Sequence, residues 1–203
     1  MFTGIVQGMA KLIFIERKQN FQTYTIELLK GMSDGLMIGA SISNNGCCLT
    51  VTRVEGNLVS FDLMQTTLKL TNLGNLNEGM FVNVERSMTF GGEIGGHNMS
   101  GHISTTAKVD EIVKTTNNCS IWFSMLPNLM KYILEKGYIG LDGCSLTIGE
   151  IEEQRFRVDF IPETLKSTLF GKRTVGDRIN VEFDLQTQAI VDTIERILAR
   201  KQL

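Results

Sequence analysis

The sequence is poor in the features that would point to several common protein classes. Among its 203 residues are only two prolines, two histidines and one tryptophan. With 42% hydrophobic and 21% charged residues, the composition is typical of a folded protein and not of a disordered chain. No run of about 18 apolar residues is present, so we expect no membrane-spanning helix. The stretch from Met1 to Val6 lacks the basic and apolar regions of a secretory signal, and we therefore expect a cytoplasmic protein.

The charge and the metal-binding residue types exclude two further classes. Lys and Arg number 20 against 22 acidic residues, so the net charge of −2 does not favour binding to nucleic acid. No C-x-x-C pair occurs, and the few thiols and imidazoles do not have the spacing of a structural metal site, so we expect none. We expect most of the thiols to be small buried hydrophobic groups. The residues considered are Cys47, Cys48, Cys119, Cys144, His97 and His102.

An internal repeat determines the predicted architecture. A shift of 97 residues without a gap aligns Gly46–Thr50 with Gly143–Thr147, and the same register continues in both directions. The chain is therefore predicted to consist of two copies of one module. The glycine-rich residues 91–96 lie between the copies and are predicted to be a linker, because they lack the G-K-[ST] sequence of a phosphate-binding loop. Further aligned blocks are Thr67–Lys69 with Thr164–Lys166 and Asn83–Glu85 with Asn180–Glu182.

Each module has the pattern of short strands. Residues 50–54 and 58–63 alternate apolar and polar side chains around Glu55-Gly56-Asn57, which predicts a hairpin, and the second copy repeats the pattern. Closely spaced strands of this kind favour a small closed barrel or a sandwich in each module. Short helices are predicted over residues 66–72 and 163–169, and another after Pro127 that ends at Gly137.

A longer helix is predicted from about Gln188 to Lys201. Apolar residues recur on one side at helical spacing, and charged residues line the other side. The apolar stripe could pack on the chain's own barrel or on copies of itself, and the pattern alone leaves both open. The stripe consists of Ile190, Val191, Ile194, Ile197 and Leu198.

The two copies differ at positions that could carry chemistry. Because strand side chains alternate, Cys48 shares a face with Thr50, and Ser145 shares the corresponding face with Thr147. Two related surfaces of small polar groups suit hydrogen bonding to a planar heteroaromatic ligand. His102 replaces an isoleucine of the first copy and is the best candidate for acid–base work, although a single histidine is more often structural.

These motifs resemble the riboflavin synthase family of the α-chain type. The resemblance covers essentially the whole chain and is carried by five blocks together with the repeat. The blocks are Met1–Gly8, Asn45–Thr50, Met99–His102, Asp142–Thr147 and Ile161–Leu165.

The resemblance implies an all-β fold of two tandem six-stranded Greek-key barrels and a C-terminal α-helix that assembles a homotrimer. The expected boundaries are residues 1–96 for the first lumazine-binding barrel, 97–187 for the second and 188–203 for the helix. It implies a transferase that moves a four-carbon unit between two molecules of 6,7-dimethyl-8-ribityllumazine, giving riboflavin and 5-amino-6-ribitylaminouracil in the final step of riboflavin biosynthesis. Neither a metal nor a redox cofactor is expected, and whether lumazine synthase is a partner is left open.

The resemblance also implies the site residues. The active site is expected to join the first barrel of one subunit to the second barrel of its neighbour, with Lys136 contributed by a partner chain. Expected catalytic residues are His102, Cys48, Ser145, Ser41 and Asp184. One substrate is expected to contact Gly4, Ile5, Val6, Ser145, Leu146, Thr147, Phe160, Ile161, Pro162, Glu163, Thr164 and Leu165. The other is expected to contact Cys48, Leu49, Thr50, Asp62, Leu63, Met64, Gln65, Thr66, Thr67, Gly101, His102 and Ile103.

The hypothesis for the chemistry is that His102 transfers protons and that Cys48 and Ser145 orient or add to the substrate rings. The main alternative is a non-catalytic lumazine- or flavin-binding antenna protein of the same fold. A flavoprotein reductase barrel would need an additional nucleotide-binding domain, and an oligonucleotide-binding barrel is disfavoured by charge and by few aromatic residues.

Overall fold

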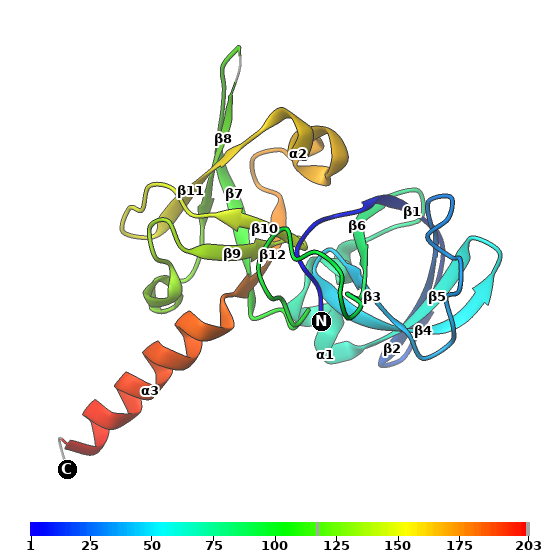
Figure 1. Cartoon of the computed structure of the whole chain (residues 1–203), viewed down its shortest axis with the longest axis horizontal. Helices are drawn as coiled ribbons and strands as arrows, with labels where there is room; N and C mark the ends of the chain where they lie inside the picture. The colour runs from blue at the N-terminus through cyan, green and yellow to red at the C-terminus, as the bar shows by residue number, and fades with distance from the viewer. Residues whose placement is uncertain (117, 202–203) are drawn as a thin grey trace.

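Short antiparallel strands build both halves of the chain, and their side chains alternate between a buried and an exposed face. In the strand Leu58–Met64, Val59, Phe61 and Leu63 are buried while Asp62 and Met64 are exposed. The computed structural model describes residues 1–116 and 118–201. These form two barrels and a C-terminal helix that projects from the second barrel (Figure 1).

The first barrel is closed, with the strand order β1-β2-β5-β4-β3-β6. The second sheet has the order β10-β9-β12-β7-β8-β11, which is the same cyclic order shifted by six strands and nearly closed. Across its open edge, the backbone N–H of Gly149 donates to the carbonyl of Arg157 at 2.8 Å. The predicted fold class is therefore confirmed. The first barrel contains β1 (Gly8–Lys18), β2 (Phe21–Glu27), β3 (Ser41–Asn44), β4 (Cys47–Glu55), β5 (Leu58–Met64) and β6 (Phe81–Arg86). The second contains β7 (Thr105–Lys114), β8 (Cys119–Ser124), β9 (Tyr138–Leu141), β10 (Cys144–Thr147), β11 (Arg155–Phe160) and β12 (Arg178–Phe183).

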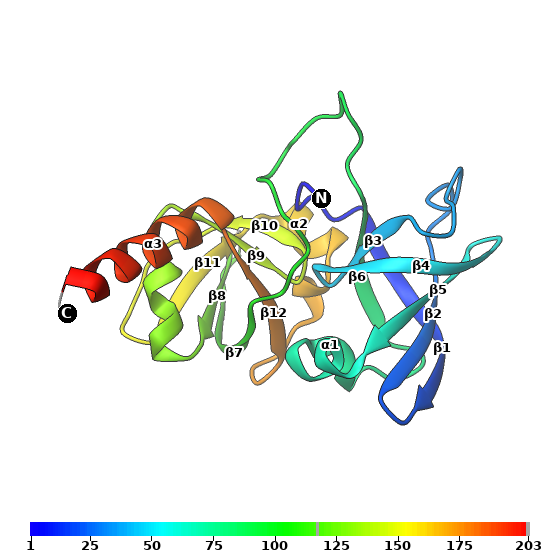
Figure 2. The same cartoon turned by 90° about the horizontal axis from the view of Figure 1, so that it is seen from below.

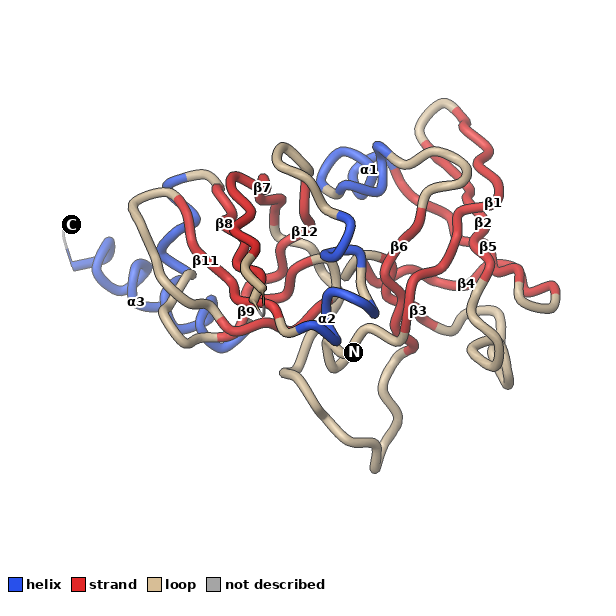
Figure 3. Tube along the Cα trace, turned by 90° about the horizontal axis from the view of Figure 1, so that it is seen from above, coloured by secondary structure: helices blue, strands red, loops and turns tan. Residues whose placement is uncertain are grey.

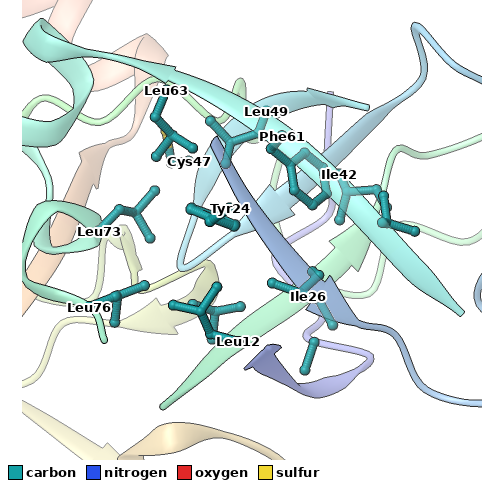
Figure 4. Close-up of a cluster of buried hydrophobic side chains, with 14 of the residues drawn as sticks. Leu12, Tyr24, Ile26, Ile42, Cys47, Leu49, Phe61, Leu63, Leu73 and Leu76 are labelled. Atoms are coloured by element: carbon teal, nitrogen blue, oxygen red, sulfur yellow. The ribbon is translucent and has the colours of Figure 1, made fainter. Parts of the chain in front are cut away.

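The repeat extends to local irregularities. A β-bulge between Leu12 and Phe14 in β1 recurs between Val109 and Glu111 in β7, at positions 97 residues apart. A bulge sharpens the bend of a strand, as the closure of a small barrel requires. Each barrel is filled by its own apolar cluster, and Figure 4 shows that of the first barrel around Tyr24 and Phe61.

Two of the predicted short helices are present close to the expected positions. They are α1 (Gln65–Leu70) and α2 (Pro162–Ser167), and each is followed by a 3₁₀ helix, η1 (Asn72–Asn75) or η3 (Leu169–Lys172). The predicted helix from Pro127 to Gly137 is wrong in type and length, because a 3₁₀ helix, η2 (Pro127–Tyr132), takes its place. The side chain of Ile133 is only 5% exposed in the core of the second barrel, and its anchoring there ends the helical turn.

The C-terminal helix α3 (Leu185–Lys201) begins three residues before the predicted start at Gln188. The carboxylate of Asp184 explains this, because it accepts hydrogen bonds at 2.8 Å from the backbone N–H and the hydroxyl of Thr187. In the part of the chain that the structure describes, no helix is long and apolar enough to cross a membrane.

Buried side-chain amides join the two barrels across an approximate two-fold relationship. The Asn83 side chain donates to the carbonyl of Asp142 at 2.9 Å, and the Asn180 side chain donates to the carbonyl of Asn45 at 2.8 Å. The connection between the barrels forms a long loop beside this contact (Figure 2), and it includes the predicted linker residues 91–96. The barrels are therefore held in a fixed relation by paired polar contacts.

Candidate functional site

The segment before the second barrel, residues 101–103, crosses to the first barrel. The carbonyl of Gly101 accepts a hydrogen bond from the backbone N–H of Cys48 at 2.8 Å, and Ile103 packs into the core of the first barrel. A cavity of about 220 Å³ lies here, and we refer to this surface as the first half-site. It is lined by Cys47, Thr66, Thr67, Leu70, Thr71, Gly101, His102 and Ile103.

The segment before the first barrel, residues 4–6, makes the reciprocal crossing. The carbonyl of Gly4 accepts a hydrogen bond from the backbone N–H of Ser145 at 2.8 Å, and Val6 packs against the core of the second barrel. We refer to the surface formed by these residues as the second half-site. The structure therefore brings residues 101–103 to β4 and residues 4–6 to β10.

Glycine is required where each crossing segment meets a strand. Gly101 has φ of +81°, and a Cβ atom added to it would lie 2.6 Å from the Cβ of Cys48. Gly4 has φ of +76°, and the corresponding distance to the Cβ of Ser145 is 2.5 Å. Any other residue would be strained and would push the crossing segment away from the strand.

Two buried glutamates hold the crossing segments. Glu85 accepts hydrogen bonds from the N–H groups of Thr3 and Gly4 at 2.7 and 3.0 Å. Glu182 accepts them from the N–H groups of Ser100 and Gly101 at 2.6 and 3.0 Å. Burial raises the pKa of both carboxyls, and these hydrogen bonds oppose that rise. The sequence analysis found these residues in a repeated block but assigned them no role.

His97 is a second residue that the sequence analysis missed. Its Nδ1 atom lies 2.6 Å from the hydroxyl oxygen of Ser145, and its ring stacks on Tyr138 with centroids 5.1 Å apart. The side chain is 7% exposed and its Nε2 atom has no hydrogen-bond partner. Burial lowers the pKa of His97, and the negative charge of Asp184 acts in the opposite direction. The 97-residue shift aligns His97 with no position of the printed sequence, so the repeat could not reveal it.

The remaining predicted catalytic residues divide between the half-sites. Ser41 lies on β3 directly opposite Thr50 of β4, beside Cys48 in the first half-site. Asp184 lies near His97 in the second half-site and also caps α3. His102 is exposed at the rim of the first half-site. Ser145 is therefore hydrogen-bonded to His97 in the second half-site, whereas Cys48 is bonded through its backbone to Gly101, the residue before His102, in the first.

The predicted substrate-binding residues differ in how far their side chains are exposed to a ligand. Leu63 and Phe160 are each 1% exposed and point into the barrel cores, so their side chains can only support the half-sites. Met64 and Ile161 occupy equivalent positions and are 61% and 65% exposed, which leaves apolar surface beside each half-site. Lys136 is exposed at a turn with φ of +63°.

The other predicted substrate-binding residues are distributed over the same elements. Leu49 and Leu146 point inward from β4 and β10, whereas Thr50 and Thr147 are exposed. Asp62 lies on the outer face of the barrel, where it accepts a hydrogen bond from Thr23. Ile5 is exposed in the second half-site. Gln65, Thr66 and Thr67 form the first turn of α1, and Pro162, Glu163, Thr164 and Leu165 belong to α2.

Within the described residues 1–116 and 118–201, no three His, Cys, Asp or Glu side chains are placed to hold a metal ion. The half-sites instead offer hydroxyl, thiol and imidazole groups beside backbone N–H groups and exposed apolar side chains. This combination suits a planar polar ring, bound by hydrogen bonds at its edge and by apolar contact on its face.

Comparison with known proteins agrees with this arrangement. The chain matches the lumazine binding domain family twice, over residues 3–87 and 100–184, and is thus a protein of two tandem lumazine-binding domains. It is 59% identical to riboflavin synthase of Escherichia coli (strain K12) over 203 residues, covering 100% of this chain and 95% of that protein. It is 37% identical to riboflavin synthase of Bacillus subtilis (strain 168), covering 91% and 86%. The chain belongs to the riboflavin synthase family.

Solved structures of LumP are similar in fold. LumP complexed with riboflavin superposes with a TM-score of 0.84 at 30% sequence identity, covering 91% of this chain and 100% of that one. LumP complexed with 6,7-dimethyl-8-(1'-D-ribityl) lumazine gives a TM-score of 0.82 at 29% identity. The family and the enzyme class predicted from the sequence are confirmed, and the higher identity to the synthases does not favour the antenna alternative.

Proposed function

We propose that this chain catalyses the dismutation of two molecules of 6,7-dimethyl-8-ribityllumazine. One molecule gives up a four-carbon unit and leaves as 5-amino-6-ribitylaminouracil, and the other receives the unit and becomes riboflavin. The atoms of the two substrates equal those of the two products, so the reaction requires no net oxidant or reductant.

The observation that carries this proposal is the reciprocal crossing of the two segments. In each crossing a glycine carbonyl accepts a backbone hydrogen bond of 2.8 Å, that of Gly4 from Ser145 and that of Gly101 from Cys48. One chain therefore presents two related surfaces for one kind of ligand. A reaction between two identical molecules needs two such surfaces. Holding two reactants in reacting geometry can contribute roughly 7 to 11 kcal/mol to a rate enhancement.

The chemistry begins with removal of a proton from the C7 methyl group of one lumazine. The resulting carbanion is delocalised into the pteridine ring, so a base of moderate strength suffices. We assign this proton transfer to the imidazoles, with the exposed His102 at the first half-site and the buried His97 acting through the hydroxyl of Ser145 at the second.

The second substrate must present an electrophilic ring carbon next to C7. A hydroxyl or thiol that adds to C7, or that holds a water molecule there, prepares the ring for attack by the carbanion. We assign this role to the Cys48 thiol or the Ser145 hydroxyl, which lie at equivalent positions of the two half-sites. Ser41 and Thr50 add hydroxyl groups next to Cys48, because they face each other on β3 and β4.

We further propose that the protein is a homotrimer assembled through α3. The polar side of α3 is held by its own barrel, where Tyr132 donates a hydrogen bond to Asp192 and Lys131 pairs with Glu195. The apolar stripe is left uncovered, since Ile190, Ile194, Ile197 and Leu198 are 48% to 60% exposed. A trimer would cover this stripe and bring the first half-site of one chain to the second half-site of its neighbour, close to Lys136.

A cytoplasmic location is proposed with support from the cysteines. All four, Cys47, Cys48, Cys119 and Cys144, are free thiols, which is typical of proteins in a reducing compartment. An association with lumazine synthase, which would supply the substrate, stays a hypothesis.

The test is anaerobic incubation of the purified protein with 6,7-dimethyl-8-ribityllumazine and no added cofactor. Equal amounts of riboflavin and 5-amino-6-ribitylaminouracil are expected, with two lumazines consumed for each riboflavin formed. Tight binding of the lumazine without turnover would overturn the proposed reaction and would support a carrier or antenna function.

A further inference from the structure

The second barrel has an open mouth that the proposed reaction does not use. A cavity of about 570 Å³ is lined by residues of α2 and of the ends of β7 and β8. These three elements lie in the upper part of Figure 1. Its apolar floor is formed by Cys119, Phe160 and Leu165, and Lys114 and Lys166 line its sides. This volume lies within the range of small-molecule sites, which commonly occupy the mouths of β-barrels.

The first barrel provides an internal reference for this cavity. The corresponding mouth, 97 residues earlier in the chain, encloses only about 270 Å³. Gln22 occupies the position of Cys119 there, and Phe21 occupies that of Asn118. Gln22 is 5% exposed and its Nε2 atom has no hydrogen-bond partner, so filling the first mouth leaves a buried polar atom unsatisfied. The second copy has smaller side chains at both positions, and its mouth is open.

The open mouth is separate from the half-sites because the two lie on different faces of the short helices. In the first barrel, Thr66, Thr67 and Leu70 of α1 line the half-site cavity, whereas Gln65, Leu68 and Lys69 line the mouth. In the second barrel, the residues of α2 at the mouth are Pro162, Leu165 and Lys166. Figure 3 shows α2 at the side of the second barrel that faces the first barrel. Pro162 and Leu165, which the resemblance assigned to a substrate, therefore face the mouth.

We propose that the mouth of the second barrel binds a small amphipathic anion. The apolar body of the ligand, an aromatic ring or a short aliphatic chain, would lie against the half-buried Leu165, with the nearly buried Cys119 and Phe160 beneath it. Its carboxylate, sulfonate or phosphate group would be held by Lys114 and Lys166, whose ammonium groups bind such anions. The first barrel also has basic residues at these positions, Arg17 and Lys69, but its floor is filled.

The experiment is a fluorescence titration of the full chain with 8-anilinonaphthalene-1-sulfonate, repeated with variants. We expect the probe to bind one site in each second barrel. C119Q, which installs the side chain of the first copy, should weaken this binding at least tenfold, and so should K166E. The matched control K69E changes the equivalent lysine of the first barrel and should leave binding unchanged. Lys166 is exposed, so K166E tests the site even if C119Q perturbs folding.

Three results would overturn the proposal. One is no binding of the probe up to millimolar concentration. Another is equal binding to K166E and K69E, which would place the probe elsewhere, for example on the apolar stripe of α3. The third is full displacement of the probe by 6,7-dimethyl-8-ribityllumazine, which would place it in a half-site. Riboflavin formation by K166E at the wild-type rate is expected and would separate this site from the reaction.

Discussion

The Nδ1 atom of His97 lies 2.6 Å from the hydroxyl oxygen of Ser145, although 48 residues separate them in the chain. The equivalent of Ser145 in the first barrel is Cys48, which has no hydrogen bond to a histidine, and its backbone N–H is bonded to Gly101, the residue before the exposed His102. The duplicated module therefore has two chemically different half-sites. A dismutation needs this difference, because one substrate must act as donor and the other as acceptor of the four-carbon unit.

Replacing either partner of this hydrogen bond should slow turnover. We expect S145A and H97Q each to lower kcat by about 10² to 10⁴, the range typical of general acid–base catalysis. The double variant should be scarcely slower than the slower single variant, because the two residues act as one unit. Steady-state kinetics of riboflavin formation would measure these effects.

A matched control is S120A, because Ser120 also donates its hydroxyl to another side chain, Asp159, on the outer face of the second barrel. It should retain wild-type kcat. A decrease of less than threefold in both S145A and H97Q would contradict the role of the pair in catalysis.

The lowered pKa of His97 predicts a specific dependence of stability on pH. Above the ordinary value of 6.5, the imidazole is neutral in both the folded and the unfolded chain, and it has no effect on the pH dependence. Below 6.5 the unfolded chain binds the proton first, because burial lowers the pKa in the folded state. The free energy of unfolding should therefore fall as the pH drops from 6.5 to the folded-state pKa, by at most about 1.4 kcal/mol per pH unit, and not change further below it.

Urea unfolding at pH 7.5 and at several values down to pH 5 would measure this effect. The wild type should lose more stability over this interval than H97Q, which lacks the titrating group. Parallel stability curves for the two proteins would mean that His97 is not held neutral by burial. The two proteins differ only at residue 97.

The glycines of the crossing segments should not tolerate a side chain. The free energy of unfolding of G101A should fall by about 1 to 2 kcal/mol because alanine is strained in the left-handed conformation. It should fall by a further 1 to 3 kcal/mol, on the order expected for overpacking, because the added Cβ meets Cys48. G79A is the matched control, because Gly79 has φ of +88° and nothing lies within 4 Å of an added Cβ. The free energy of unfolding of G79A should fall only by the cost of the left-handed conformation.

Urea unfolding would give both stabilities, and lumazine binding would report on the half-site. G101A should also bind the substrate more weakly, because displacement of residue 101 moves His102 away from the first half-site. Equal free energies of unfolding of G101A and G79A would contradict this prediction, because the crossing segment could then move away from β4 without loss of stability.

Periodicity and the repeat could predict much of this fold. The alternation of apolar and polar residues in β5 can be recognised within a few neighbouring residues, and the aligned glycines reveal the repeat. The prediction that Cys48 and Thr50 share one face of β4 follows from the alternation of side chains along a strand. The crossing of residues 4–6 to the second barrel could not be derived from local patterns, since it depends on the buried contacts of Glu85 with Thr3 and Gly4. Only the family resemblance grouped Gly4 with Ser145. His97 could not be predicted because its partner Ser145 is 48 positions away in the sequence and the 97-residue shift aligns His97 with no printed residue.

The apolar stripe of α3 provides the test of assembly. We expect I194K to prevent trimer formation, because it places a charge in the centre of a stripe that α3 of each neighbour must cover. Ile194 is 51% exposed in the single chain, so the substitution should leave the barrels folded. The control R196E changes the polar side of the same helix and should remain trimeric. Analytical ultracentrifugation would give the assembly state, and near-UV circular dichroism would confirm that the barrels are intact.

The kinetic consequence distinguishes two arrangements of the active site. If each site joins the first half-site of one chain to the second half-site of another, dissociated I194K should bind lumazine but form no measurable riboflavin. Each half-site is complete within one chain, since Gly101 meets Cys48 and Gly4 meets Ser145 in the same molecule, so binding does not require a neighbour. A monomeric I194K with wild-type turnover would instead mean that both substrates meet within one chain, and the proposed contact between subunits would be wrong.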